Sequence, residues 1–228
     1  MTEKLLDADC WIFDLDNTLY PVSCNLFDEI DRRMKEFIAD YLDLPPDEAF
    51  KIQKRYFHEF GTTLKGLMTV HDMEPGPFLE HVHDVDLRAV VENPRLNDAL
   101  GRLKGRKVIF TNASRGHAER VIAKIGIGHR FDGIFDIVDA GYIPKPETAV
   151  YRRLMARLSV RPEKSVMVED MARNLVPAEA LGMTTVWVRT GSDFGHEGSD
   201  GNHIHHETDD LTDWLTQLPD GETAKPAG

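Results

Sequence analysis

The sequence predicts an α/β protein with a doubly wound parallel sheet and an inserted, all-helical second domain. Short apolar runs alternate with helical segments in the second half of the chain, as in parallel strands joined by crossover helices. A long stretch without strand pattern follows the first apolar run, and polar residues stand at the ends of several runs. We expect residues 1–18 and 95–218 to form the α/β core and residues 19–94 to form a helical cap over it.

The composition narrows the class of protein. A chain of 228 residues with 41% apolar residues fits one large domain, or a core with a smaller insertion. The net charge of −12 argues against binding nucleic-acid polymers or an anionic membrane surface. Cys10 and Cys24 have neither metal-site spacing nor a disulfide framework, and no long apolar segment opens the chain. We therefore expect a cytoplasmic protein with reduced cysteines.

The spacing of apolar residues and the positions of prolines predict the first strand and the helices of the cap. The apolar run at about 10–14 predicts a buried strand. Apolar residues then recur at three- and four-residue intervals over 24–41 and 46–60, and a shorter helix follows Pro75. The intervening segment 61–67 holds two glycines and two threonines, and we interpret it as a connection between helices.

The remaining elements alternate regularly. Strands are expected at 107–112, 134–138, 165–170 and 184–188, and helices at 95–103, 114–125, 147–158, 173–181 and from 211. Residues 191–202, rich in Gly, Ser and Asp, predict a loop, and 203–206 predict a short edge strand. We expect residues 219–228 to be a disordered tail.

Two carboxylates close the first strand. Asp14 and Asp16 stand at positions i and i+2, where ligand sites lie in open α/β sheets. They repel each other unless a cation or a shared proton offsets the charge, and Mg²⁺ with oxygen ligands is the simplest partner. Mg²⁺ in turn indicates phosphate chemistry. The alternative is that each Asp only caps the turn after the strand.

Three further segments bring polar residues to the same edge of the sheet, namely Thr111 and Asn112, Lys145, and Glu169 with Asp170. Asp14 is then the candidate nucleophile, and Asp16 the candidate general acid and base. Thr111 and Lys145 could hold phosphoryl oxygens, while Asp170 joins Asp14 around the metal. Asn112 is a further phosphate candidate or a helix cap, and Glu169 is a metal ligand or supports one.

The motifs D-L-D-N-T, T-N, K-P and E-D-x-x-x-N, in this order, resemble those of the haloacid dehalogenase-like hydrolase superfamily. The resemblance covers about 8–190 and implies a Rossmann-like core with a mobile helical cap. It implies an Mg²⁺-dependent phosphomonoesterase that uses the residues named above. Asp14, the carbonyl of Asp16, and Asp170 would bind metal; Asn174 and Thr18 would support them. Segment 61–67 would meet the leaving group when the cap closes.

Finer motifs resemble the pyrimidine 5′-nucleotidase branch, namely W-I-F-D-L-D-N-T-L-Y-P, G-T-T-L-K-G-L and I-F-T-N-A. This resemblance implies UMP and CMP as substrates. The alternatives are a sugar-phosphate or other small-metabolite phosphatase, a phosphomutase, or a catalytically silent regulatory module. A dehalogenase would not need Asp16, because no leaving alkoxide awaits a proton. The protein is expected to be a monomer or a homodimer.

Other polar residues receive plainer interpretations. Arg115 and His117, at the start of a helix, could touch the substrate. His81 and His83 are interpreted as ordinary cap residues. The histidines near the end of the chain are irregularly spaced and are interpreted as solvated surface, at positions 196, 203, 205 and 206.

Overall fold

The computed structural model describes residues 2–191 and 193–219. In this part of the chain, six parallel strands form one sheet with the order β3-β2-β1-β4-β5-β6. The strands are β1 (Cys10–Phe13), β2 (Arg106–Phe110), β3 (Gly133–Phe135), β4 (Ser165–Glu169), β5 (Thr184–Val188) and β6 (His206–Thr208). β1 lies at the centre, between β2 and β4, so its carboxyl end is flanked by the ends of both neighbours.

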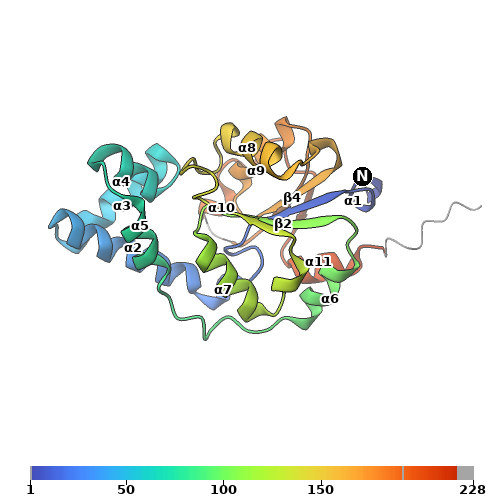
Figure 1. The fold of residues 1–228 in the computed structure, drawn as a ribbon, viewed down its shortest axis with the longest axis horizontal. Helices are drawn as coiled ribbons and strands as arrows, with labels where there is room; N and C mark the ends of the chain where they lie inside the picture. The colour runs from blue at the N-terminus through green and yellow to red at the C-terminus, as the bar shows by residue number, and fades with distance from the viewer. Residues whose placement is uncertain (1, 192, 220–228) are drawn as a thin grey trace, which may run out of the picture.

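Helices cover both faces of the sheet (Figure 1). One face carries α6 (Pro94–Arg102), α7 (Arg115–Ile125) and α11 (Leu211–Gln217); the other carries α8 (Thr148–Leu158) and α9 (Ala172–Ala180). Trp11 and Phe13 of β1 belong to the apolar cluster of the first face, whereas Cys10 and Ile12 belong to that of the second. The sequence therefore reads as a continuous apolar run because both sides of β1 are buried. The doubly wound parallel sheet is confirmed.

The cap consists of α2 (Leu26–Leu42), α3 (Pro46–Phe60), α4 (Thr63–His71) and α5 (Pro75–His83), which lie together at one side of the core in Figure 1. The helices pack through aromatic contacts such as Phe37 edge-on against Phe78, with ring centroids 5.3 Å apart. The predicted helical cap is confirmed. Shorter elements complete the fold, namely α1 (Thr2–Leu6), α10 (Asp193–His196), η1 (Val22–Cys24), η2 (Gly128–Arg130) and η3 (Pro162–Lys164).

Local chemistry sets where several helices begin. Proline occupies the first turn of α3, α5 and α6, where its missing N–H costs nothing. Side chains cap α6 as well as α4 and α11: Asn93 accepts from the Leu96 N–H, Thr62 from that of Lys65, and Asp210 from that of Asp213.

The segment 61–67 was predicted as a connection, and this is wrong beyond Thr62. Helix α4 begins at Thr63 because the Thr62 hydroxyl accepts the Lys65 N–H at 3.2 Å. Gly66 then allows close approach, since a Cβ at this position would lie only 2.3 Å from the Cβ of Tyr56. Glycine here serves helix packing between α3 and α4 rather than loop flexibility.

Two strands and one loop differ from their predicted limits. β3 is shorter than 134–138 because the chain turns at Asp136, whose carboxylate accepts the N–H groups of Arg115 and Asp139. The edge strand begins at His206 instead of 203, because His205 reaches Thr185 through its ring Nδ1 rather than through the sheet ladder. The predicted loop 191–202 contains α10. The predicted tail, from 220 on, lies outside the described residues.

The packing of Gly66 is testable. Gly66→Ala forces a methyl group against buried Tyr56, so we expect it to lower the free energy of unfolding by about 1–3 kcal/mol. Gly76→Ala is the matched control, because this helical glycine has no atom within 4 Å of a built Cβ. Urea unfolding of both variants measures the difference. Equal stability of Gly66→Ala and the wild type would contradict the role assigned to Gly66.

Candidate active site

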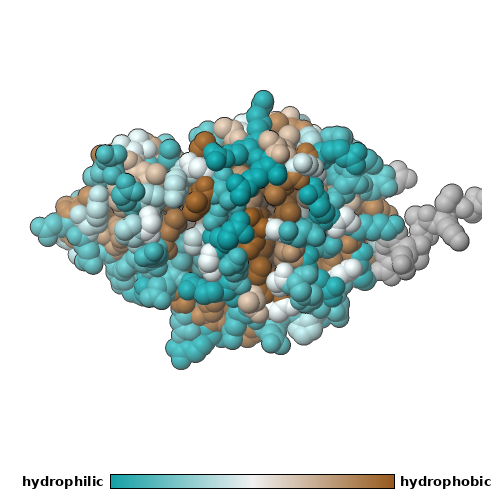
Figure 2. All heavy atoms as spheres, in the orientation of Figure 1, coloured by the Kyte–Doolittle hydropathy of each residue, from teal (hydrophilic) through white to brown (hydrophobic). Residues whose placement is uncertain are grey.

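A cavity of about 330 Å³ lies between the cap and the carboxyl ends of β1, β2 and β4. This size suits a small-molecule ligand. Figure 2 shows hydrophobic residues where the cap meets the core, and others across the core on the same face. The core lines the cavity with polar residues, namely Asp14, Asp16, Thr111, Asn112, Lys145, Glu169, Asp170 and Asn174. The cap adds apolar residues, such as Ile30, Met34, Phe57, Phe78, Leu79 and Val82, and about as many polar ones, among them Asp28, Asp31, Gln53 and Lys54.

Lys145 holds the centre of the polar floor. Its side chain is 2% exposed, and its Nζ donates to Asp14 Oδ1 at 2.6 Å and to the Phe110 carbonyl at 3.0 Å. Glu169 lies 3.3 Å from the same nitrogen. Burial by itself lowers the pKa of Lys145, but attraction from Asp14 and Glu169 outweighs it and raises the pKa above its ordinary value. Lys145 is therefore a fixed positive charge.

Asn112 positions this lysine. Its side-chain Oδ1 accepts the Lys145 N–H at 2.9 Å, and its Nδ2 donates to the Lys145 carbonyl at 3.4 Å. Both ends of the amide are thus committed to the backbone of Lys145. The predicted contact of Asn112 with phosphate stays a prediction, and the structure gives its side chain a different task.

Three carboxylates gather beside Lys145. Asp14, Glu169 and Asp170 each offer an oxygen, and these oxygens lie within 4.8 Å of one another. Burial, followed by repulsion from Asp14, raises the pKa of Glu169 to about 8, and burial together with Glu169 and Asp14 raises the pKa of Asp170 well above its usual range. Burial also raises the pKa of Asp14, against the attraction of Lys145.

This cluster fits Mg²⁺. Its donors are all oxygens, and its negative charge exceeds that of the single lysine beside it, so a divalent cation would relieve the repulsion. Asn174 donates from Nδ2 to Glu169 Oε1, which holds that carboxylate in place, while its own Oδ1 is buried without a partner in the described chain. Among residues 2–191 and 193–219, no second group of this kind occurs. The prediction that the late histidines are solvated surface is wrong for His203, which is buried with its Nε2 3.1 Å from the Ala172 carbonyl oxygen.

Asp16 belongs to a separate network. Its Oδ1 accepts the hydroxyl of Tyr20 at 2.7 Å and lies 3.0 Å from Nε2 of His117. Burial by itself would raise the pKa of Asp16, but its contacts with His117 and Tyr20 outweigh burial and lower the pKa. Sequence reasoning missed Tyr20, although it stands four residues after Asp16. It placed His117 at the right helix start, but assigned no role toward Asp16.

His83 is not an ordinary cap residue. Its ring stacks on that of His117, with centroids 4.6 Å apart and planes 24° apart, and Nδ1 lies 2.9 Å from the Ser114 hydroxyl oxygen. Burial lowers the pKa of His83 to about 3, so the ring is neutral. Arg115, in contrast, turns away from the cavity: its guanidinium pairs with Asp139 at 2.7 Å.

The two threonines have modest contacts. Thr18 donates to Asp14 Oδ2 at 3.3 Å, which supports the candidate nucleophile. The Thr111 hydroxyl oxygen accepts the N–H of Ala113 at 2.9 Å, and its own proton remains available toward the cavity that Thr111 lines. The predicted site residues are thus gathered at one edge of the sheet, with their chemical roles still to be tested.

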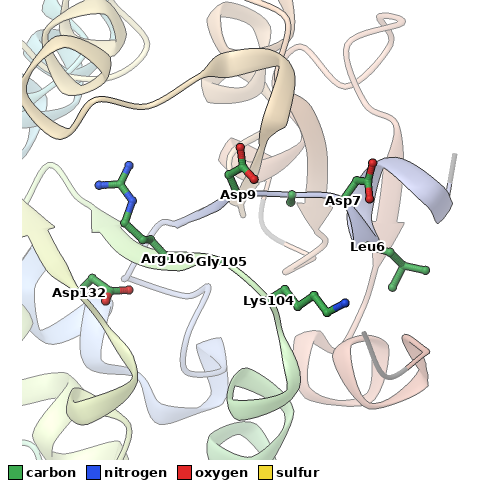
Figure 3. A pocket seen from close by; sticks show the side chains of 8 residues that line it. Leu6, Asp7, Asp9, Lys104, Gly105, Arg106 and Asp132 are labelled. Atoms are coloured by element: carbon green, nitrogen blue, oxygen red, sulfur yellow. The ribbon is translucent and has the colours of Figure 1, made fainter. Parts of the chain in front are cut away.

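A larger hollow of about 440 Å³ lies far from these residues, at the amino ends of β1 and β2 (Figure 3). Its charged groups are largely engaged with the chain itself: Asp9 pairs with Arg161, Asp7 with Lys164, and Asp132 accepts the N–H of Lys107. Ligand sites of parallel sheets lie at the opposite ends of the strands. We therefore assign the functional site to the smaller cavity.

The comparisons with known proteins agree with the site. A family model described as haloacid dehalogenase-like hydrolase matches residues 8–182. The chain belongs to the haloacid dehalogenase-like hydrolases. The superfamily resemblance of the motifs is confirmed, whereas the pyrimidine 5′-nucleotidase branch is not indicated by the relatives.

Curated relatives match over most of this chain. Phosphate metabolism protein 8 of Saccharomyces cerevisiae is 27% identical over 203 residues, which cover 79% of this chain and 62% of the yeast protein. The match thus spans less than two thirds of that relative. A glyceraldehyde 3-phosphate phosphatase of Methanothermobacter thermautotrophicus is 26% identical over 194 residues, covering 78% of this chain and 84% of that protein.

Solved structures share the fold. A haloacid dehalogenase-like phosphatase from Thermococcus onnurineus has a TM-score of 0.61 at 20% identity, covering 93% of this chain and 98% of its own. A haloacid dehalogenase-like hydrolase from Bacillus subtilis, bound to magnesium, has a TM-score of 0.57 at 14% identity, covering 92% of this chain and 98% of its own. An L-2-haloacid dehalogenase from Xanthobacter autotrophicus has a TM-score of 0.52 at 16% identity, covering 96% of this chain and 92% of its own. The fold alone therefore does not separate the two activities.

A helix that crosses a bilayer needs about 20 consecutive, mostly apolar residues, and the helices of this chain can be judged by that requirement. None of those in residues 2–191 and 193–219 combines the length and apolar character needed to cross a membrane.

The raised pKa of Glu169 gives a pH prediction. Without metal, the folded state holds a proton on Glu169 up to about pH 8, whereas the unfolded chain loses it near the ordinary glutamate pKa of about 4.3. The folded state binds more protons between these values, so we expect the free energy of unfolding in EDTA to fall as the pH rises from 5 to 8. Mg²⁺ should restore stability at pH 8.

Urea unfolding at several pH values, with EDTA or Mg²⁺, measures this. Glu169→Gln should reduce the pH dependence in EDTA without abolishing it, because Asp14 and Asp170, whose pKa values are also raised, remain. Glu163→Gln is the control, since that side chain is exposed. The same pH dependence in the wild type and Glu169→Gln would show that this carboxyl is not responsible.

Proposed function

We propose that the protein is an Mg²⁺-dependent phosphomonoester hydrolase in which Asp14 becomes transiently phosphorylated. The observation that carries this is the floor of the cavity: one oxygen of Asp14 is 2.6 Å from Lys145 Nζ, and Asp16 lies beside it in its own hydrogen-bond network. A carboxylate held by a fixed cation, with a second carboxylate available for proton transfer, is what phosphoryl transfer through an enzyme ester requires.

The chain's own residues divide the chemistry. The Asp14 carboxylate attacks phosphorus and the bond to the leaving oxygen breaks, while Asp16 gives that oxygen a proton. Asp16 then takes a proton from the water that attacks the phosphorylated Asp14, which releases phosphate and restores both carboxyl groups. Lys145 and Thr111, which both line the cavity, would hold the phosphoryl oxygens, whose charge grows during transfer.

Mg²⁺ would be held by Asp14 and Asp170, with Glu169 in the same cluster as a third oxygen donor or as their support. When bound, the ion supplies positive charge that neutralises the phosphoryl group. The predicted ligation by the Asp16 carbonyl stays part of the proposal, as do the domain limits of 1–18 and 95–218 for the core and 19–94 for the cap. The cap helices, all within 19–94, support these limits.

The favoured substrate class is a small sugar phosphate or similar phosphorylated metabolite. Two distant relatives, from Methanothermobacter thermautotrophicus and Pyrococcus furiosus, are named glyceraldehyde 3-phosphate phosphatases, at 26% and 24% identity. The motif resemblance to pyrimidine 5′-nucleotidases is the remaining reason to test UMP and CMP, since the relatives do not support that branch.

The network of Asp16 favours a phosphatase over a dehalogenase on the same fold. A halide leaves without needing a proton, so a dehalogenase does not need a second carboxylate that is held by two hydrogen-bond donors. Here Tyr20 and His117 both contact one oxygen of Asp16 and so orient its carboxyl group beside Asp14, which a group that exchanges protons with a substrate requires.

The proposal predicts the behaviour of Asp14→Asn. This variant keeps a similar volume but loses the nucleophile, so we expect turnover to fall at least about 1,000-fold while the protein stays folded. Phosphate release measures it, with Mg²⁺ or EDTA, from glyceraldehyde 3-phosphate, glucose 6-phosphate, β-glucose 1-phosphate, UMP, CMP, AMP, pyridoxal phosphate and 4-nitrophenyl phosphate. Chloride release from L-2-chloropropionate tests the dehalogenase alternative.

Asp98→Asn, on the exposed face of α6, is the matched control and should keep wild-type turnover. Normal turnover by Asp14→Asn would refute the nucleophile assignment. Turnover of UMP and CMP well ahead of the sugar phosphates would reverse the substrate proposal and leave the chemistry intact. No turnover of any compound would favour a regulatory module without catalysis.

A further inference from the structure

We propose that His83 and His117 form a positioning pair that couples the cap to Asp16, so that the position of the cap controls where the candidate general acid points. This inference rests on the proposed function, because it concerns the proton donor of that reaction. It starts from two buried histidines, one at the end of cap helix α5 and one in core helix α7, whose rings stack 4.6 Å apart.

The core half of the pair holds one oxygen of Asp16. His117 is 1% exposed, and its Nε2 lies 3.0 Å from Asp16 Oδ1, the same oxygen that accepts the Tyr20 hydroxyl at 2.7 Å. An N–H and an O–H that converge on one oxygen fix the plane of the carboxyl group. Neither bond uses Oδ2, so this is the oxygen left to exchange a proton with a substrate.

The ring of His117 has no second side-chain hydrogen bond in the described chain to fix its orientation. Its Nδ1 is buried and has no hydrogen-bond partner in the described chain. The ring is therefore oriented by Asp16 at one edge and by the flat ring of His83 at its face, 24° from parallel. Removing His83 would leave the face of His117 uncovered and its orientation free to change.

The cap half is tied to the core. His83 ends α5, and its Nδ1 lies 2.9 Å from the Ser114 hydroxyl oxygen, while Arg120 donates to its carbonyl. His83 also lines the cavity. Any movement of α5 that lifts the cap would thus shift the ring against which His117 is packed, and with it the carboxyl group of Asp16.

Loss of this positioning has a distinctive signature. An alkyl phosphate releases a strongly basic alkoxide and needs a well-placed acid, whereas 4-nitrophenolate leaves without a proton. kcat/KM reports the steps up to phosphoryl transfer, so a misplaced Asp16 lowers it for the alkyl ester and spares the aryl ester. General loss of structure would lower both values together.

The experiment compares kcat/KM for 4-nitrophenyl phosphate and for the best alkyl phosphate of the substrate panel, at saturating Mg²⁺. We expect His117→Leu to lower the alkyl value about 10- to 100-fold and to change the aryl value less than about 3-fold. His117→Gln, which retains an N–H donor, should recover part of the alkyl activity. His83→Ala should act in the same direction as His117→Leu, whereas His83→Phe, which keeps a flat ring, should stay nearer to the wild type.

His129→Ala, an exposed histidine on η2, is the control and should change neither value. Equal losses with both esters would overturn the proposal in favour of a structural role, and unchanged values would overturn it outright. If His117→Leu does not fold, the His83 pair decides: the same ester selectivity in His83→Ala and the wild type overturns the coupling. A wild type that hydrolyses neither ester would instead overturn the proposed function.

Discussion

The buried contact between Lys145 and Asp14 sets the terms for the whole site. An ammonium group with almost no access to water is tolerated only beside anions, and Asp14 and Glu169 provide them. Burial, followed by repulsion among carboxylates that outnumber the single lysine, raises the pKa values of Glu169 and Asp170. The surplus of negative charge favours a divalent cation, which the cluster could hold because of the same burial that fixes the lysine.

The sheet supplies that burial. β1 is covered on both faces and lies between two parallel neighbours, so its first polar residue, Asp14, emerges where three strand ends meet. β4 brings Glu169 to the same edge through the register that pairs Phe13 with Val168. Lys145 comes from a connection rather than a strand, and Asn112 clamps its backbone from the end of β2. Because the strands are closely packed and buried, the polar residues at their carboxyl ends are held in fixed positions.

The cap adds a second level of control. Its apolar residues close the cavity above the polar floor, and His83 at the end of cap helix α5 contacts His117 of core helix α7. Arg173 of α9 also lies over the ring of Phe57 from α3, 4.5 Å from its centroid. Contacts of this kind give a cap a definite resting position, which is a condition for any coupling between cap movement and chemistry.

The sequence by itself determined the parallel sheet, the helical cap and the set of residues at the strand ends, because hydrophobic periodicity and strand-end position are local properties. The tertiary structure alone decided how those residues are held. Asp16 contacts His117, which lies 101 residues away in the sequence, and the side-chain amide of Asn112 binds the backbone of Lys145, 33 residues away. Helix α4, which begins within segment 61–67, packs closely on α3 because Gly66 fits against Tyr56. Such contacts depend on how elements pack, which no local pattern encodes.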